Sequence, residues 1–251
     1  MGWNMRKSAA IILLLASQLA FAGADYARER KWADEIIPGI VVGDPVFLEL
    51  KQGRKFLTIF TEAKDAKTGD GKLGLVVIHG LGIHPDWNMV GTLRTQLAEQ
   101  GYTTLSIQMP VLANDAEGEA YLPLFPEAEE RIAVAVDFLQ AKGYKKIAIV
   151  SHSMGSAMSR MFVENNQHRL AAWASLGIGR GYTYSGISIP VLDLYGEHDL
   201  PPVLQTAKKR AASLNENLNS RQVMVAKSDH FYNDHEAEMV KAVNNFLGSI
   251  K

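Results

Sequence analysis

The chain has 251 residues, of which 47% are hydrophobic, and a formal net charge of -1 at pH 7. This length and hydrophobic content predict one globular domain with a sizeable core. A mean hydropathy of -0.05 without a long internal apolar run argues against a polytopic membrane protein. Lysines and arginines do not cluster, which argues against nucleic acid as a partner. The chain has no cysteine, which excludes disulfides and thiol nucleophiles.

The N-terminus has the pattern of a secretory signal peptide. Arg6 and Lys7 precede an apolar run over 9–16, and the pattern ends in Ala-x-Ala at Ala22. An uncleaved anchor helix is the alternative, but the apolar run is too short to span a bilayer comfortably. We therefore predict a signal peptide over 1–22 that is cleaved after Ala22. The mature protein is expected to be periplasmic or secreted in a bacterium, with no stable membrane insertion.

The mature chain begins with an irregular lead-in over 23–45, which contains one short helical pattern over 27–36. A single domain over 46–251 follows. It opens with strands at 46–50 and 56–61, which the intervening glycine-containing turn joins as an antiparallel hairpin.

Strands and helices then alternate along the rest of the chain, after a polar segment over 64–72 that is typical of a surface loop. Apolar runs predict strands over 73–78, 103–109, 146–150, 171–178, 191–195 and 222–226. Amphipathic patterns predict helices over 86–100, 127–142, 156–165, 203–214 and 236–247. This alternation predicts the α/β class, with a doubly wound, mostly parallel sheet and an antiparallel hairpin at its start.

One strand runs directly into the sequence Ser-His-Ser-Met-Gly at 151–155. A serine at a sharp strand-to-helix turn, with small residues two positions before and after it, is the layout of a nucleophile elbow. The turn would lift the hydroxyl of Ser153 above the sheet edge and aim the first helical amides at an anion there. The pattern departs from the usual one at Ser151, where glycine is common. Taken alone, it fits a plain junction with a helix-capping serine equally well.

Other candidate residues follow the ends of other strands, where ligands bind in sheets of this kind. A glycine-rich loop occupies 79–82, Asp199 follows a later strand and His230 follows the last one. Taken singly, these are also explained as a glycine turn, a helix cap and a solvated histidine. Together with Ser153 they supply a nucleophile, an acid and a base in that chain order, next to a loop with free amides. The combination predicts one site at the sheet edge.

This chain order is the one found in α/β-hydrolases. The chain resembles that superfamily over about 46–247, through the motifs at 79–82, 151–155, 196–199 and 229–231. The stretches HGLGIHPDW at 79–87 and TLSIQMPV at 104–111 further resemble a group of exported bacterial members whose function is unassigned.

The resemblance implies a serine hydrolase that cleaves a carboxylic ester or thioester through an acyl-enzyme on Ser153. His230 would be the general base and Asp199 would orient it, while the amides of Leu81 and Met154 would form the oxyanion hole. The alternative is a non-catalytic binding or scaffold protein that retains the fold.

The remaining site residues carry less specific signals. Four residues are predicted to contact substrate because they lie next to Ser153 or in the loop over 79–82, which is called the oxyanion loop below. They are His79, Gly80, Gly82 and His152. Asp193 and Glu197 lie near the predicted acid, and His235 is a second candidate base. No cofactor is expected, and no metal, since the spacing of the histidines and acids fits no known ligand motif.

Access to the site is predicted from the longer connections. The segment 179–189 is too short for a lid domain. The longer segment over 110–126 either forms a wall of the site or is an irregular crossover with no special role. Its acidic and aromatic residues would favour neutral or cationic substrates over anionic ones. We expect an open site for a small-molecule or envelope-derived acyl substrate rather than for lipid emulsions. The sequence predicts no oligomeric state.

Overall fold

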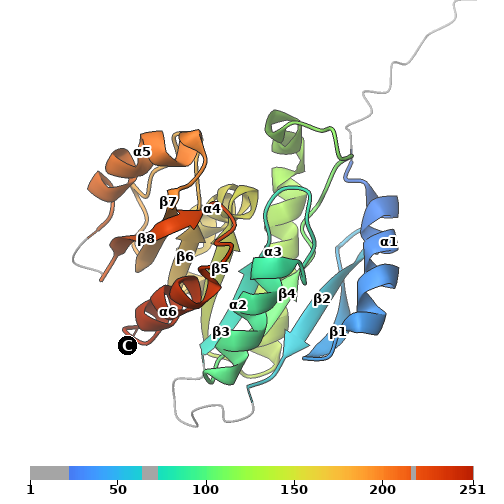
Figure 1. Ribbon diagram of the computed structural model, residues 1–251. Helices are drawn as coiled ribbons and strands as arrows, with labels where there is room; N and C mark the ends of the chain where they lie inside the picture. The colour runs from blue at the N-terminus through green and yellow to red at the C-terminus, as the bar shows by residue number, and fades with distance from the viewer. Residues whose placement is uncertain (1–22, 64–72, 216–218, 251) are drawn as a thin grey trace, which may run out of the picture.

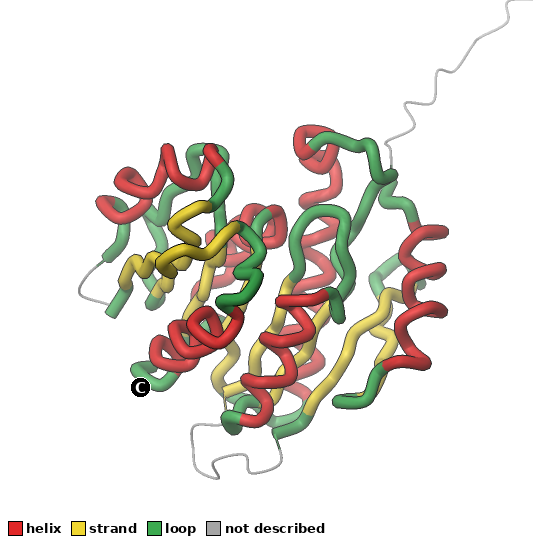
Figure 2. The backbone as a smooth tube through the Cα atoms, viewed as in Figure 1, coloured by secondary structure: helices red, strands yellow, loops and turns green. Residues whose placement is uncertain are grey.

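The computed structural model describes residues 23–63, 73–215 and 219–250. The predicted signal peptide over 1–22 and the predicted surface loop over 64–72 lie outside these residues. Figures 1 and 2 show a twisted sheet with helices on both faces, and the short helix of the lead-in beside the hairpin strands. None of the helices in the described part of the chain is long and apolar enough to cross a bilayer.

Eight strands form one sheet in the spatial order β1-β2-β4-β3-β5-β6-β7-β8. β1 and β2 are antiparallel to each other, β2 is antiparallel to β4, and every later pair is parallel. The strands are β1 (Asp44–Glu49), β2 (Lys55–Thr61), β3 (Leu73–Ile78), β4 (Thr103–Ile107), β5 (Lys146–His152), β6 (Ala172–Leu176), β7 (Val191–His198) and β8 (Arg221–Asp229). The predicted mostly parallel sheet with an N-terminal hairpin is confirmed.

Two apolar layers enclose the sheet because side chains alternate between its faces. One layer packs mainly against α3 and α4, and the other against α2 and α6. The helices are α1 (Tyr26–Ile36), α2 (Asn88–Glu99), α3 (Phe125–Ala141), α4 (Met154–Asn166), α5 (Pro201–Ala212) and α6 (Glu236–Leu247), with short 3-10 turns η1 (Ile37–Gly39), η2 (Gly118–Leu124) and η3 (Gln167–Arg169).

The boundaries of several elements differ from the predicted ones. β4 ends at Ile107 rather than at Met109, and the Met109 N–H donates to the His79 ring instead. β7 and β8 run further than predicted, so Asp199 and His230 come directly after their strands. The 110–126 segment contains η2, which the sequence patterns did not predict.

A buried ion pair attaches the lead-in helix α1 to the domain. Arg131 of α3 is fully buried and donates to both carboxylate oxygens of Glu29, at 2.9 and 3.1 Å. It also donates to Glu127 at 2.6 Å and to the carbonyl of Gln108 at 3.0 Å. Burial raises the pKa of Glu29, and the arginine charge opposes that rise. The pair therefore depends on the arginine to keep a buried carboxylate satisfied.

We expect Arg131→Met to lower the free energy of unfolding by about 3 kcal/mol, because it leaves the Glu29 carboxylate buried without its partner. The double variant with Glu29→Gln should recover part of this loss. Urea denaturation followed by circular dichroism measures both. As a control, Arg169→Met removes an exposed ion pair to Asp137 and should cost below about 1 kcal/mol. A loss no larger than that of the control would show that the buried pair contributes little.

Candidate active site

Ser153 occupies a sharp turn between β5 and α4. Its backbone lies at φ 54° and ψ -122°, in a region that residues other than glycine rarely adopt. Its side chain does not cap α4. A Cβ at Gly155 would collide with the carbonyl oxygen of His79, so only glycine fits where α4 passes the oxyanion loop. These features form a nucleophile elbow and exclude the helix-capping interpretation.

The departure at Ser151 is accommodated by hydrogen bonds. Its hydroxyl is buried, accepts from the Trp173 indole N–H at 2.8 Å and lies 3.1 Å from the hydroxyl of Ser156. The partners come from β6 and α4, the two elements that approach this point. The small polar side chain is therefore satisfied in a position where glycine is usual.

The three predicted catalytic residues form one hydrogen-bonded chain. Nε2 of His230 lies 2.9 Å from Oγ of Ser153, and Nδ1 of His230 lies 2.5 Å from Oδ1 of Asp199. Asp199 also accepts from the Gly196 N–H at 3.2 Å and the Leu200 N–H at 2.7 Å, which fix its carboxylate. His230 and Asp199 are 5% and 4% exposed, so the chain is shielded from water except at the serine.

The other candidate acids and base have separate partners. Asp193 is fully buried and paired with Arg210. Glu197 accepts from the backbone N–H of Lys227, and His235 lies 3.9 Å from Glu238. None of the three alternatives is hydrogen-bonded to the chain that ends at the serine.

His79 is buried below the oxyanion loop and does not line the cavity, contrary to the predicted substrate contact. Nε2 of His79 accepts the Met109 N–H at 2.8 Å, so Nδ1 carries the proton and donates to the Gly80 carbonyl at 2.8 Å. Burial lowers the pKa of His79 to about 3, which keeps the ring neutral. The histidine thereby holds the backbone that leads to Leu81.

The two predicted oxyanion amides are free to bind an anion. The Met154 N–H is the first of α4 and has no intrahelical acceptor. The Leu81 N–H makes no backbone hydrogen bond within the described residues. Both residues line the same cavity as Ser153, and a Cβ at Gly80 would lie only 3.0 Å from Cβ of Ser153. The loop over 79–82 thus passes directly over Ser153.

His152 contacts His230 through both a hydrogen bond and ring packing. Its Nε2–H donates to the backbone carbonyl of His230 at 2.9 Å, and the two ring centroids are 4.7 Å apart. Burial, followed by the nearby His230, lowers the pKa of His152 to about 3. Its Nδ1 has no partner among the described residues. A neutral ring therefore packs against the base without adding charge beside it.

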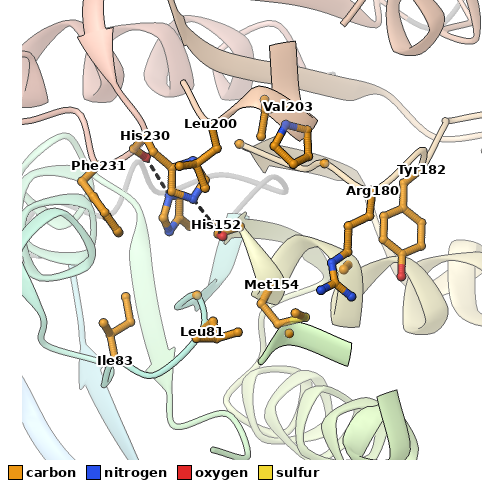
Figure 3. Close-up of a pocket in the computed structure, with 17 residues that line it drawn as sticks. Leu81, Ile83, His152, Met154, Arg180, Tyr182, Leu200, Val203, His230 and Phe231 are labelled. Atoms are coloured by element: carbon orange, nitrogen blue, oxygen red, sulfur yellow. Dashed lines mark hydrogen bonds between the residues drawn. The ribbon is translucent and has the colours of Figure 1, made fainter. Parts of the chain in front are cut away.

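A cavity of about 330 Å³ opens above Ser153. Figure 3 shows His152, His230 and Phe231 on one side of it and Arg180 and Tyr182 on the other, with Met154 between them. Of the residues predicted to contact substrate, Gly80 and His152 line the cavity and Gly82 does not. From the 110–126 segment only Gly118 reaches it, so the predicted acidic rim is wrong.

Arg180 and Tyr182 were missed by the sequence analysis. They follow the end of β6, at the same sheet edge as the other site residues. The rule that ligands bind beyond the carboxyl ends of strands would have pointed to them. In the described part of the chain, no group of three or more His, Cys, Asp or Glu side chains is placed to hold a metal ion.

Comparison with solved structures shows the fold. The chain is similar to an α/β serine hydrolase without lid from Xanthomonas campestris (14% identity, TM-score 0.65, covering 83% of this chain and 95% of that one). It is also similar to ferulic acid-bound Est1E from Butyrivibrio proteoclasticus (15% identity, TM-score 0.66, covering 82% of this chain and 98% of that one). A third similar structure is dienelactone hydrolase from Anabaena variabilis (15% identity, TM-score 0.68, covering 83% of this chain and 97% of that one). No family model and no curated protein matches the sequence.

The chain therefore has the fold of the α/β-hydrolase superfamily, and the resemblance seen in the sequence is confirmed at that level. The connection between β6 and β7 is a short irregular segment, so the described chain carries no lid domain there, as predicted.

The buried neutral histidines predict a pH dependence of stability. The unfolded chain binds protons at His79 and His152 below about pH 6.5, whereas the folded chain does so only near pH 3. Stability is therefore fully present above pH 6.5 and is lost as the pH falls. We expect each histidine to lower the free energy of unfolding by about 2 kcal/mol between pH 7 and pH 5.

Urea denaturation at the two pH values measures this fall. His152→Gln should remove about half of the part due to the two histidines, and His168→Gln, a change at an exposed histidine, is the matched control. His79→Gln provides a second, independent variant. An unchanged pH dependence in both buried-site variants would mean that these rings are not the proton-linked groups.

Proposed function

We propose that the protein is a serine hydrolase that cleaves a carboxylic ester or thioester through an acyl-enzyme on Ser153. The observation that carries the proposal is the continuous hydrogen-bonded chain from Ser153 through His230 to Asp199, at the mouth of a cavity. The solved structures similar to this chain include a serine hydrolase and an esterase, which supports the same class.

The first half of the reaction would form the acyl-enzyme. Nε2 of His230 accepts the proton of Ser153 as Oγ attacks the acyl carbon. Asp199 holds Nδ1–H and stabilises the imidazolium that forms. The imidazolium then gives its proton to the departing alcohol or thiol, so the leaving group departs neutral.

The amides of Leu81 and Met154 would stabilise the negative charge on the acyl oxygen. Removing one such donor typically costs about 3 kcal/mol of transition-state stabilisation. In the second half, His230 takes a proton from water as the water oxygen attacks the acyl carbon, and it then gives that proton to Oγ of Ser153 as the acyl–serine bond breaks and the acid is released. The same amides serve this step, because the charge develops on the same oxygen.

The strained backbone argues against a purely binding role. Ser153 has a positive φ and Gly155 is required for the close approach of α4 to the oxyanion loop. Such strain costs of order 1–3 kcal/mol and persists where function depends on it. A scaffold protein would gain nothing from this turn.

We extend the proposal to an exported enzyme, because the signal-peptide pattern over 1–22 precedes the fold. Its substrate would then be an acyl compound outside the cytoplasm, including those of the cell envelope.

Ser153→Ala should lower kcat/KM for p-nitrophenyl butyrate by about 10⁴-fold or more, since it removes the attacking oxygen. Ser188→Ala, a change at an exposed serine bonded to Gln167, is the control and should leave the rate unchanged. A fluorophosphonate probe should label the wild type and the control but not Ser153→Ala. Equal hydrolysis by all three proteins, with no labelling, would favour the scaffold alternative.

The acyl chain-length profile should favour short esters. The cavity of about 330 Å³ lies at the low end of ligand pockets, which span roughly 300–1,000 Å³. We expect kcat/KM for p-nitrophenyl acetate and butyrate to exceed that for the laurate ester several-fold. A preference for the laurate ester would show that long chains bind outside the cavity.

A further inference from the structure

The cavity above Ser153 is lined mostly by apolar side chains and glycines, and one permanently charged residue, Arg180, lies among them. Its guanidinium makes no hydrogen bond and no ion pair with any described residue. Arg180 is solvent-exposed at the mouth of the cavity, whereas the buried arginines of the fold, Arg94, Arg131 and Arg210, are each paired with a carboxylate. An arginine that lines a cavity and has no partner is available to a ligand.

The backbone at Arg180 has an uncommon conformation. Arg180 has φ 58°, a left-handed conformation that is uncommon for a residue other than glycine. It lies on the connection after β6, between Gly179 and Gly181. The strain is local and lies at the cavity, where such outliers often have a functional cause.

The opposite wall leaves room for the guanidinium. A Cβ at Gly118, the first residue of η2, would collide with Nη2 of Arg180 and would lie 3.3 Å from the methyl of Met154. Figure 3 shows the Arg180 side chain beside Met154, on the far side of the cavity from Phe231. The guanidinium is thus seated between the oxyanion residue Met154 and a glycine backbone.

The acidic residues next to Gly118, which faces the guanidinium, do not neutralise it. Glu117 and Glu119 flank Gly118, but both side chains are exposed, neither lines the cavity, and neither forms an ion pair with Arg180. A guanidinium presents several N–H donors in a planar fork that matches the two oxygens of a carboxylate. The cavity offers no second permanent cation, so it suits a singly charged group better than a phosphate dianion.

We propose that Arg180 binds a carboxylate on the substrate, so that the enzyme prefers esters which carry a free carboxyl group at the end of the cavity beside Met154. This proposal rests on the proposed serine hydrolase activity and specifies its substrate class. It reverses the preference for neutral or cationic substrates that the sequence predicted, because the acidic side chains of 110–126 stay outside the cavity. Arg180 is a specificity-determining residue and takes no part in the proton transfers.

The test compares esters that differ only in one charge. The probes are the mono-p-nitrophenyl esters of adipic and suberic acid and, for each, the methyl ester that caps its free carboxyl group. We expect the ratio of kcat/KM for the charged ester to that of its capped form to fall about tenfold in Arg180→Gln, mainly through KM. The capped esters should be hydrolysed as fast as by the wild type.

Further variants distinguish a direct contact between Arg180 and the substrate carboxylate from a general effect of positive charge near the cavity. Arg180→Lys keeps the charge but loses the fork and should retain an intermediate preference. The ratio of kcat/KM for the charged ester to that of its capped form should be lower in Arg180→Glu than in Arg180→Gln, because the new carboxylate repels the substrate. Arg160→Gln removes a nearby arginine that is paired with Glu164 and does not line the cavity, and it should leave the ratio unchanged. An equal ratio in the wild type and Arg180→Gln, or an equal drop in Arg160→Gln, would overturn the proposal.

A binding measurement keeps this test independent of turnover. In the Ser153→Ala background, calorimetry should show monomethyl adipate binding about tenfold more tightly than dimethyl adipate, and Arg180→Gln should abolish that difference. If the wild type hydrolyses none of the esters but this difference is seen, the hydrolase proposal fails and the carboxylate site stands. If hydrolysis depends on Ser153 but no difference is seen in binding or rate, only the carboxylate site fails.

Discussion

The site depends on one backbone constraint, the left-handed turn at Ser153 between β5 and α4. The turn points the hydroxyl out of the sheet and starts α4 at the next residue, so that the first helical amide lies beside the nucleophile. It also brings α4 against the oxyanion loop so closely that Gly155 cannot carry a side chain. This one turn therefore sets the position of the Ser153 hydroxyl, the position of the Met154 amide and the packing of α4.

Two buried, neutral histidines hold the surroundings of that turn in place. His79 fixes the loop that contains Leu81 by bonding both to Gly80 and to the backbone after β4. His152, the last residue of β5, donates a hydrogen bond to the backbone carbonyl of His230 after β8 and so fixes that backbone. Because burial lowers the pKa of both rings to about 3, they hold these backbone segments without placing a charge next to His230.

The sequence predicted most of this architecture, and the reasons are local. Apolar periodicity located every strand of the sheet, and the strand ends located Ser153, Asp199 and His230. The sequence did not reveal contacts between distant segments, such as Trp173 with Ser151 or Met109 with His79. No spacing rule encodes such pairs, because they depend on how neighbouring strands are registered.

The prediction of an acidic rim failed because the sequence does not reveal which residues of a distant segment face the cavity. Composition showed acids in 110–126, but the turn η2 presents only the backbone of Gly118 to the cavity. Exposed apolar side chains of Leu81, Leu200 and Phe231 come instead from the loops that carry the oxyanion amide, the acid and the base. The loops that carry the candidate site residues therefore also make the apolar wall. The charge that remains in the cavity, Arg180, comes from the segment after β6. Substrate preference can change there without disturbing the hydrogen-bonded chain, because Arg180 shares no hydrogen bond with it.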